Sequence, residues 1–276
     1  MGFVRRIAIL LALICVGAPA VDIQSQQPFR ILVTNDDGVR APGIAALAQE
    51  LKSIGEVTIV APSENQSGKG HSISITDPVY VDNVTLPSGL QALSATATPA
   101  SCVKLALLAP LTERPNLVVS GINRGYNLGR TTYVSGTVGA AREGSFHGIP
   151  AIASSMDTAN GWSDYTAAAR ATTEVARLVK EHGLPPHVFL NVNIPTGMPK
   201  GIRWATQSML IGEETWVEHT NPRGRRYFWN DYKDSTRDVE GTDVALAAAG
   251  YIAVVPLRAM EFDAAAAEKL KSWKFR

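Results

Sequence analysis

Two adjacent acidic residues, Asp36 and Asp37, stand between Asn35 and Gly38, and Thr34 separates this segment from the apolar run at 31–33. An apolar run that ends in polar residues and a glycine is typical of a buried strand reaching its carboxyl end. In an open parallel sheet, ligands bind beyond the carboxyl ends of the strands. Adjacent carboxylates at one strand end repel each other unless a cation lies between them. From these residues alone, a metal site and a solvated turn in which Asp36 caps the next helix are equally good interpretations.

Two further polar segments follow predicted strands. Residues 61–70 form a polar loop after the second strand, which can bring hydroxyl and amide groups near the end of the first. Asn123 follows a third apolar run, at 117–119, although an asparagine taken singly is more often a turn residue. Together the three segments offer carboxylate, hydroxyl and amide oxygens, a ligand set that suits Mg²⁺ or Mn²⁺ and disfavours zinc. His71 and His147 lie near these loops, and we assign neither a role.

A phosphate cradle is predicted beside the N-terminus of a helix. Residues 125–129 contain two glycines, and downstream Ser135, Gly136 and Thr137 precede a helical stretch. Free backbone amides and the positive end of the helix dipole can face an anion there. Ordinary helix capping by Ser or Thr is the alternative. Neither segment matches the Walker or dinucleotide patterns, so the sequence does not predict ATP or NAD binding.

The elements that must hold these groups alternate between strand and helix. A helical pattern at 42–54 leads to a strand at 57–61, which completes a βαβ unit with parallel strands. Further strands are expected at 117–119, 149–153 and 188–194, and helices at 137–146 and 164–182. This alternation predicts a three-layer α/β fold with a mostly parallel sheet. Turn residues and aromatic residues at about 201–232 predict a projecting β-hairpin, and 258–276 a C-terminal tail with a short helix.

The N-terminus has the pattern of a secretory signal peptide over residues 1–20. Two arginines precede the apolar run 7–16, and small residues at 18–20 offer a cleavage point. The run is too short to span a bilayer comfortably, so we expect no stable membrane anchor. Residues 21–29 then form a linker. The sequence therefore predicts a protein that is exported to the periplasm or secreted.

The composition is that of a folded chain without a strongly charged partner. With 45% hydrophobic and 18% charged residues over 276 positions, the chain can bury a sizeable core. Removal of residues 1–20 leaves 24 basic and 25 acidic residues, which does not favour a nucleic-acid polymer or a membrane surface as partner. Cys102 is then the only cysteine, so stability must come from packing rather than from an intramolecular disulfide.

The order of the motifs strongly resembles that of the survival protein E (SurE) nucleotidase family. The resemblance rests on the motifs at 35–38, 41–44, 61–62, 67–68, 120–123, 127–129 and 135–137, and on later segments at 191–195, 222–224, 241–244 and 250–251. It covers residues 30–257. It implies a Rossmann-like metallophosphatase that removes phosphate from nucleoside 5′- or 3′-monophosphates, with some members also acting on short polyphosphate. It also implies a homodimer or homotetramer that uses the hairpin and exchanges C-terminal segments.

The resemblance also implies roles for individual residues. The metal ligands matched by motif are Asp36, Asp37, Ser67 and Asn123, and the catalytic candidates are Asp36, Asp37 and Asn123. The residues matched to the phosphate side are Asn127, Ser135, Gly136 and Thr137, with Asn35 as a supporting group. Two departures, Ser101 in place of the family's acidic residue and Arg130 after Leu-Gly, bear on substrate preference and subunit contacts.

The expected reaction is in-line attack on phosphorus by a water whose pKa a metal ion lowers. Either Asp36 or Asp37 can take the proton of that water, and the acid that protonates the leaving group is not identified. An aspartyl-phosphate mechanism is disfavoured because the two acids are adjacent rather than one position apart. The alternative from another class is an exported binding protein that captures nucleotides or phosphate without hydrolysis.

Overall fold

The structure of the protein, a computed structural model, describes residues 28–109, 111–158, 161, 164–210, 212–233 and 238–274. The predicted signal peptide at 1–20 and most of the predicted linker at 21–29 lie outside these residues. Among the residues described, no helix is both long enough and apolar enough to cross a membrane.

Nine strands form one sheet, and two more form a separate hairpin. The strands of the sheet are β1 (Arg30–Thr34), β2 (Glu56–Pro62), β3 (Val81–Thr85), β4 (Gln91–Ala95), β5 (Leu117–Arg124), β6 (Ala151–Met156), β7 (Val188–Ile194), β8 (Ile202–Trp204) and β11 (Ile252–Arg258). Their spatial order is β3-β4-β2-β1-β5-β6-β7-β11-β8. Within this sheet, among the residues that the structure describes, only the β3–β4 and β7–β11 pairs are antiparallel. The predicted mostly parallel sheet is confirmed.

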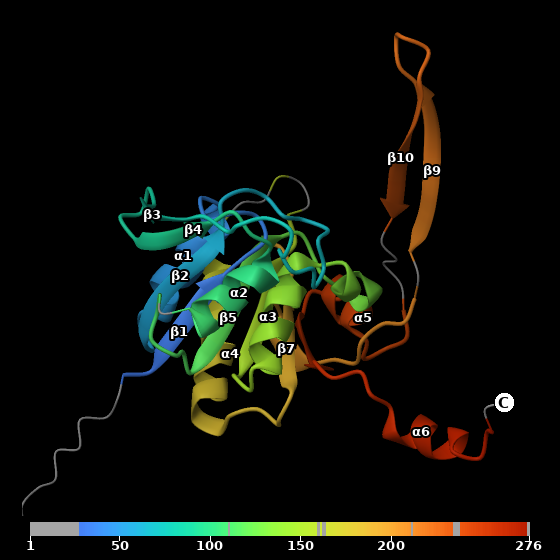
Figure 1. Ribbon diagram of the computed structural model, residues 1–276. Coiled ribbons are helices and arrows are strands. Elements are labelled where there is room, and N and C mark those ends of the chain that lie inside the picture. The colour runs from blue at the N-terminus through green and yellow to red at the C-terminus, as the bar shows by residue number, and fades with distance from the viewer. Residues whose placement is uncertain are drawn as a thin grey trace, which may run out of the picture.

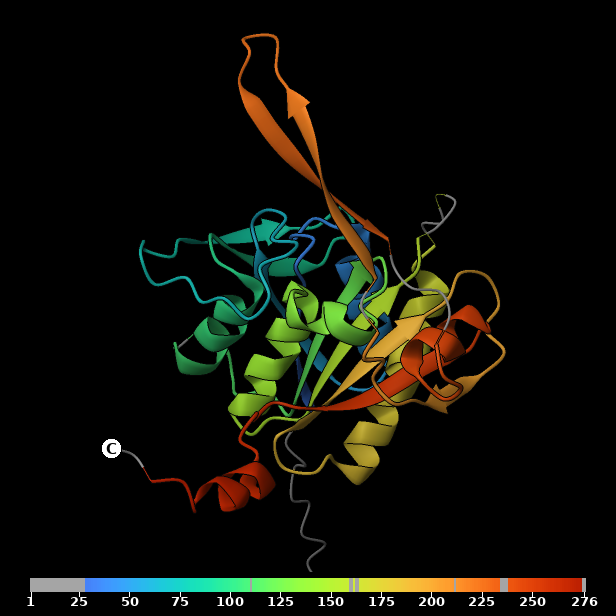
Figure 2. The ribbon, with the colours of Figure 1, turned by 90° about the vertical axis from the view of Figure 1, so that its right-hand side faces the viewer.

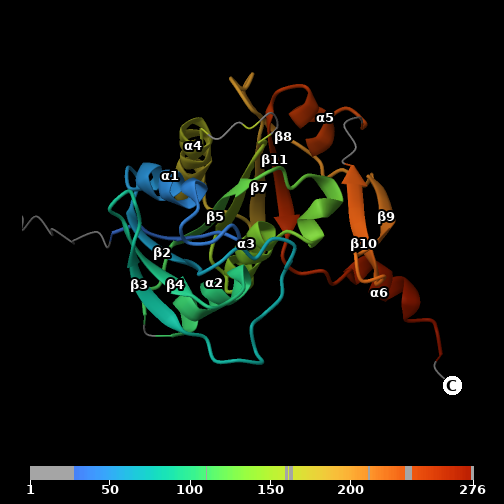
Figure 3. The ribbon, with the colours of Figure 1, turned by 90° about the horizontal axis from the view of Figure 1, so that it is seen from above.

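Helices cover both faces of this sheet (Figures 1 and 3). The helices are α1 (Pro42–Leu51), α2 (Pro99–Leu108), α3 (Gly136–Phe146), α4 (Thr166–His182), α5 (Asp243–Ala248) and α6 (Ala264–Leu270), with a 3-10 turn, η1, at Gly129–Tyr133. α1 and α4 bury their apolar residues on one face of the sheet, and α2 and α3 bury theirs on the other. The three-layer α/β prediction is therefore confirmed.

Burial on both faces explains the continuous apolar character of the central strand. In β1, Ile31 and Val33 belong to the core beneath α1 and α4, whereas Leu32 belongs to the core beneath α2 and α3. A strand covered on both sides shows no polar alternation, as expected for the centre of a parallel sheet. Polar residues begin where β1 leaves the sheet, so the site residues sit at the rim of a rigid core.

The hairpin of β9 (Glu213–Thr220) and β10 (Arg226–Lys233) projects from the body of the protein, as Figure 2 shows. Every residue of β9 is exposed. α6 also stands away from the body, and none of its residues is buried (Figures 1 and 2). The predicted projecting hairpin and C-terminal segment are both present.

The sequence patterns did not reveal several elements between 81 and 133. β3, β4, α2 and η1 were not predicted. β3 is an exposed edge strand, and α2 buries the consecutive residues 99–103, so it has no apolar stripe at helical spacing. α3 begins at Gly136, one residue before the predicted start, with Ser135 as its cap.

Candidate active site

The acidic pair and Asn123 lie where two neighbouring strands end. Asp36 and Asp37 follow β1 after a single residue, and Asn123 is the penultimate residue of β5. β1 and β5 are parallel, so both chains leave the sheet at the same edge. From β1 the chain continues to β2 on one side and later returns to β5 on the other, so the strand order reverses between β1 and β5. Open α/β sheets bind their ligands at such a switch point.

Asp36 is buried against the first turn of α3. Its Oδ1 accepts a hydrogen bond from the hydroxyl of Thr137, and the residue is only 3% exposed. A methyl group placed on Gly136 would lie 2.8 Å from the Cβ and 3.0 Å from the Oδ2 of Asp36. Glycine is therefore needed at this position for the carboxylate to reach the positive end of the α3 dipole.

Burial disfavours the charged form of both acids. Burial raises the pKa of Asp36 from 3.8 to about 6, while the hydrogen bond from Thr137 opposes this rise and the charge of Asp37 adds to it. Burial also raises the pKa of Asp37, against the backbone N–H of Arg124, which donates to Asp37 Oδ2 at 3.0 Å. A bound cation would restore the charged form of both side chains, since opposite charge favours ionisation.

The loop after β2 runs directly past the acidic pair. The backbone N–H of Gln66 donates to the backbone oxygen of Asp36 at 2.7 Å. On the same side, a methyl group on Gly38 would lie 3.2 Å from the carbonyl carbon of Glu64. This close packing places Ser67, the next residue of the loop, beside the strand end that carries the two acids.

Two asparagine side chains turn their amide nitrogens away to backbone carbonyls. The Nδ2 of Asn123 donates to the Gly125 oxygen at 2.8 Å, and the Nδ2 of Asn35 donates to the Gly38 oxygen at 2.9 Å. The Oδ1 of Asn35 is buried and has no hydrogen-bond partner among the described residues. Buried polar atoms are almost always paired, so this oxygen is available to a ligand or a water.

These residues fit a divalent ion that prefers oxygen. The structure brings two carboxylates to one strand end, with the Asn123 amide and the Ser67 loop next to them. Within the described part of the chain, no group of three or more His, Cys, Asp or Glu side chains could hold a metal ion. A site at Asp36 and Asp37 must therefore draw on neutral oxygen ligands, which suits Mg²⁺ or Mn²⁺ rather than a soft metal.

The two hydroxyls predicted to face phosphate are used within the protein. Ser135 Oγ accepts a hydrogen bond from the Val138 N–H at 3.2 Å, which is ordinary helix capping. The Thr137 hydroxyl is used by Asp36. The backbone N–H of Gly136 lies in the first turn of α3, where no helical carbonyl can accept it, whereas that of Thr137 also interacts with the Asp36 carboxylate. The Gly136 amide and the positive end of the helix dipole can therefore face an anion.

Asn127 does not lie at the end of β1 with the acidic pair. It lies at the ends of β6 and β7. Its Nδ2 donates to Ser155 Oγ at 2.8 Å, and its backbone N–H donates to Asn193 Oδ1 at 2.8 Å. The Nδ2 atoms of Asn191 and Asn193 donate to its backbone oxygen at 2.8 and 3.1 Å. Asn127 is therefore the centre of a buried polar network that fixes the segment leading to η1. Asn191 and Asn193, at alternate positions of a buried strand, were not predicted as site residues.

Asp243 fixes the same segment from the other side. Its carboxylate accepts the backbone N–H of Gly129 at 2.7 Å and that of Ser208 at 2.9 Å. Burial raises the pKa of Asp243, and these backbone hydrogen bonds oppose the rise. Asp243 belongs to the motif at 241–244 but was assigned no role, because an Asp at the start of a helix is usually a solvent-exposed cap residue.

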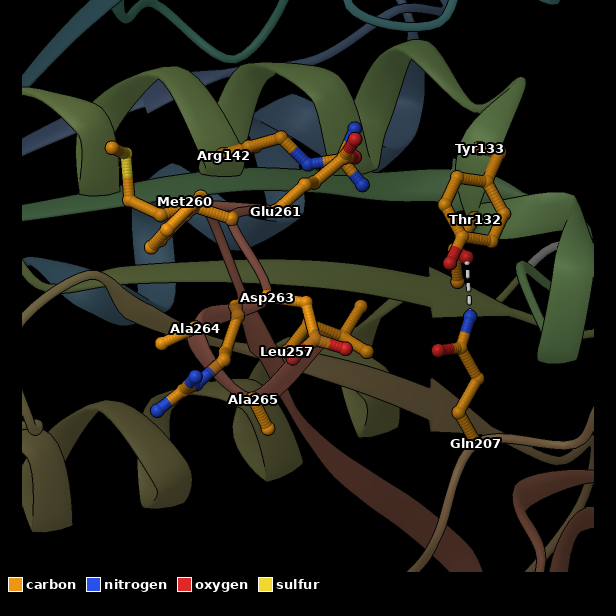
Figure 4. Close-up of a pocket in the computed structure, with 12 residues that line it drawn as sticks. Thr132, Tyr133, Arg142, Gln207, Leu257, Met260, Glu261, Asp263, Ala264 and Ala265 are labelled. Carbon is orange, nitrogen blue, oxygen red and sulfur yellow. Dashed lines mark hydrogen bonds between the residues drawn. The ribbon is translucent and has the colours of Figure 1, made fainter. Parts of the chain in front are cut away.

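Two cavities differ in their relation to this site. One, of about 430 Å³, is lined by Asp37 together with Asn65, Arg124 and Tyr165, and therefore opens onto the acidic pair. The other, of about 770 Å³, lies between α3 and the C-terminal tail, where Arg142 and Glu261 face it (Figure 4). None of the predicted site residues lines this larger cavity.

Known proteins are similar in sequence to this chain over most of its length. The sequence model of the family described as Survival protein SurE matches residues 31–214. The 5′-nucleotidase SurE of Chloroflexus aggregans is 42% identical over 250 residues, covering 89% of this chain and 99% of that protein. The 5′-nucleotidase SurE 1 of Thermus thermophilus is 44% identical, covering 83% and 91% of the two chains.

A solved structure has the same fold. The crystal structure of the SurE protein from Aquifex aeolicus superimposes with a TM-score of 0.75 at 34% sequence identity, covering 88% of this chain and 96% of that one. The family match spans well over half of the sequence and includes Asp36, Asp37, Ser67 and Asn123. The chain is therefore a member of the survival protein SurE family.

Proposed function

We propose that this protein is a metal-dependent phosphomonoester hydrolase that releases phosphate from nucleoside 5′-monophosphates, with 3′-monophosphates as the second substrate class to test. The observation that carries the proposal is the burial of Asp36 and Asp37 side by side at a switch point, against the N-terminus of α3. The relatives from Chloroflexus and Thermus carry the name 5′-nucleotidase, which supports the same activity here.

Asp36, Asp37, Ser67 and Asn123 would hold the divalent ion, Mg²⁺ or Mn²⁺. When bound, such an ion supplies charge neutralisation for the phosphoryl group and a lowered pKa for a nearby water. The chain itself orients the ligands: Thr137 holds Asp36, and the Arg124 N–H holds Asp37. Of the two carboxylates, one only ligates and the other also accepts the proton of the attacking water.

The N-terminus of α3 would bind the transferred phosphate. The Gly136 amide and the helix dipole would stabilise the negative charge that builds up on the phosphoryl oxygens. We place the nucleoside in the cavity of about 430 Å³ beside Asp37, where Arg124 and Tyr165 offer a cation and an aromatic ring. The scissile bond would then lie between the cradle and this cavity, next to the acidic pair.

The test is phosphate release from a panel of nucleoside monophosphates with Mg²⁺ or Mn²⁺, repeated with a chelator. The Asp37→Ala variant should be inactive, and Asp82→Ala, which removes an exposed acid on β3, should keep full activity. Tight metal-dependent nucleotide binding in calorimetry without any phosphate release would instead favour the binding protein. The names of the relatives do not favour that alternative. Phosphorylated Asp36 during turnover would favour the aspartyl-phosphate mechanism.

We further propose that the protein assembles as a homodimer or homotetramer through the hairpin and the C-terminal tail. An isolated two-stranded hairpin is marginally stable in water. Trp216 and Trp229 are nevertheless 65% and 66% exposed on it, and α6 buries no residue in its own chain.

Export by cleavage of residues 1–20 is proposed as well, and mass analysis of the protein recovered from the periplasm or the medium tests it.

A further inference from the structure

The loop that follows β2 and carries Ser67 is tied to α3 through a buried carboxylate. His71 Nε2, on the loop, lies 2.7 Å from Glu143 Oε2, on α3. Glu143 is only 5% exposed. The His71 ring also stacks on the ring of Phe146, with centroids 5.3 Å apart and an interplanar angle of 12°. One side chain of the loop is thus held by a hydrogen bond and by a ring contact.

The backbone of the loop reaches α3 at the preceding residue. The Gly70 N–H donates to the Val134 oxygen at 2.9 Å. A methyl group on Gly139 would lie 2.3 Å from the Gly70 oxygen, so α3 accepts this close approach only because residue 139 is glycine. The loop therefore rests directly on the helix whose first turn holds Asp36.

A second anchor lies on the other side of Ser67. The Gln66 N–H donates to the Asp36 backbone oxygen at 2.7 Å. Ser67 thus lies between an anchor to Asp36, at Gln66, and an anchor to α3 and the residue Val134 before it, at Gly70 and His71. Ser67 itself is exposed, so packing does not fix its position. The two anchors define where its hydroxyl stands.

The Glu143 carboxylate is held ionised by its neighbours. His147 Nε2 lies 3.1 Å from Oε1, and Lys104 Nζ on α2 lies 4.0 Å from the same oxygen. Burial alone would raise the pKa of Glu143, but the hydrogen bonds from His71 and His147 outweigh burial and lower it. His147 follows α3 directly and is four residues from Glu143, so its hydrogen bond adds no link to the loop.

We infer that His71 and Glu143 are positioning residues, which hold Ser67 in place as a ligand of the divalent ion. The inference rests on the proposed function, in which Ser67 is one of the metal ligands. The other proposed ligands stand just beyond the end of β1 and near the end of β5, so loss of the tether would free only the loop. Metal binding would then have to order that loop, which costs conformational entropy and weakens affinity.

The test is calorimetric titration of Mn²⁺ into the full protein and five variants. Loss of supporting residues around metal ligands typically weakens affinity by about 10–100-fold, and we expect about 10-fold for His71→Ala. The matched control His147→Ala, which removes a donor to the same carboxylate, should bind Mn²⁺ like the wild type. His71→Gln keeps a donor for Glu143 and should recover most of the affinity. The kcat at saturating Mn²⁺ should be unchanged in His71→Ala.

A double variant separates positioning from a general effect on the fold. If His71 acts through Ser67, then Ser67→Ala together with His71→Ala should bind Mn²⁺ no more weakly than Ser67→Ala alone. Equal affinity in His71→Ala and His147→Ala, or additive losses in the double variant, would overturn the inference. Absence of Mn²⁺ binding in the wild type would overturn the proposed metal function itself, and this inference with it.

Discussion

Gly136 stands so close to Asp36 that a methyl group on it would lie 2.8 Å from the aspartate Cβ. This contact joins the first turn of α3, where the phosphate would bind, to the carboxylate that would hold the metal. Backbone and carboxylate are both buried, so neither can move aside at low cost. The distance between the first turn of α3 and the acidic pair therefore depends on residue 136 being glycine, which has no side chain.

Gly136→Ala should abolish most activity because the added methyl must displace Asp36 or α3. Overpacking of a buried site costs about 1–3 kcal/mol of the free energy of unfolding, and a displacement near 1 Å costs on the order of 100-fold in rate. Urea denaturation and steady-state kinetics measure the two effects. The control is Gly183→Ala, where φ is +71° and nothing lies within 4 Å of the added carbon. That variant should lose stability and keep kcat, and equal rates in both variants would contradict the argument.

The stability of the metal-free protein should depend on pH through Asp36. Its folded pKa of about 6 lies above its ordinary value of 3.8, so this group stabilises the fold fully below pH 3.8 and loses that contribution as the pH rises through 6. The loss is on the order of 3 kcal/mol for such a shift. Asp36→Asn cannot ionise. In chelator, its free energy of unfolding relative to the wild type should therefore rise between pH 4 and pH 7. A difference that stays constant with pH would show that Asp36 is not perturbed.

Asp243→Asn should loosen the segment at η1. The Asp243 carboxylate accepts backbone N–H groups of Gly129 and Ser208 with different oxygens, whereas an amide has only one acceptor. An unpaired buried N–H costs about 1–3 kcal/mol. We expect that loss in chemical denaturation, together with a lower kcat. Asp263→Asn, at the cap of the exposed α6, should change neither quantity, since asparagine also caps helices. An Asp243 variant with wild-type stability would contradict this role.

Removal of the hairpin tryptophans should shift the assembly toward smaller species. Trp216 pairs with Asn230, and Trp229 pairs with Val217, which places the two rings on opposite faces of the ribbon. Trp216→Ser with Trp229→Ser should lower the mass measured by light scattering. Trp204→Ser is the matched control, since Trp204 is 69% exposed but lies on β8 in the main sheet. An unchanged mass in the double variant would exclude the hairpin as a subunit contact.

The sequence predicted the elements whose apolar spacing is dictated by burial. β1, α1 and β2 were recognised by their apolar residues. A strand buried on both faces is apolar throughout, whereas a helix buried on one face has apolar residues every three or four positions. β3 was not predicted because it is a short edge strand in which no residue is fully buried, so its apolar residues do not alternate with polar ones. Its place depends on pairing with β4 rather than on a pattern of its own.

The acidic pair could be singled out because its residues are adjacent in sequence, whereas contacts that form only in space left no sequence signal. Asp36 and Asp37 signal repulsion by their adjacency alone. The roles of Asn193 and Asp243 depend on backbone groups 66 and 114 residues away, which no local pattern records. Thr137 was predicted to contact the phosphate. Its hydroxyl instead donates to Asp36, because the buried carboxylate oxygen lies within hydrogen-bond distance of it.

The most direct test of the account is phosphate release from a nucleoside 5′-monophosphate, measured in one experiment on the wild type and Asp37→Ala across a range of Mn²⁺ concentrations. The account predicts that wild-type turnover is lost in chelator and returns in proportion to bound Mn²⁺, while Asp37→Ala stays at the chelator level throughout. Full wild-type turnover in chelator, or wild-type rates in Asp37→Ala, would contradict it.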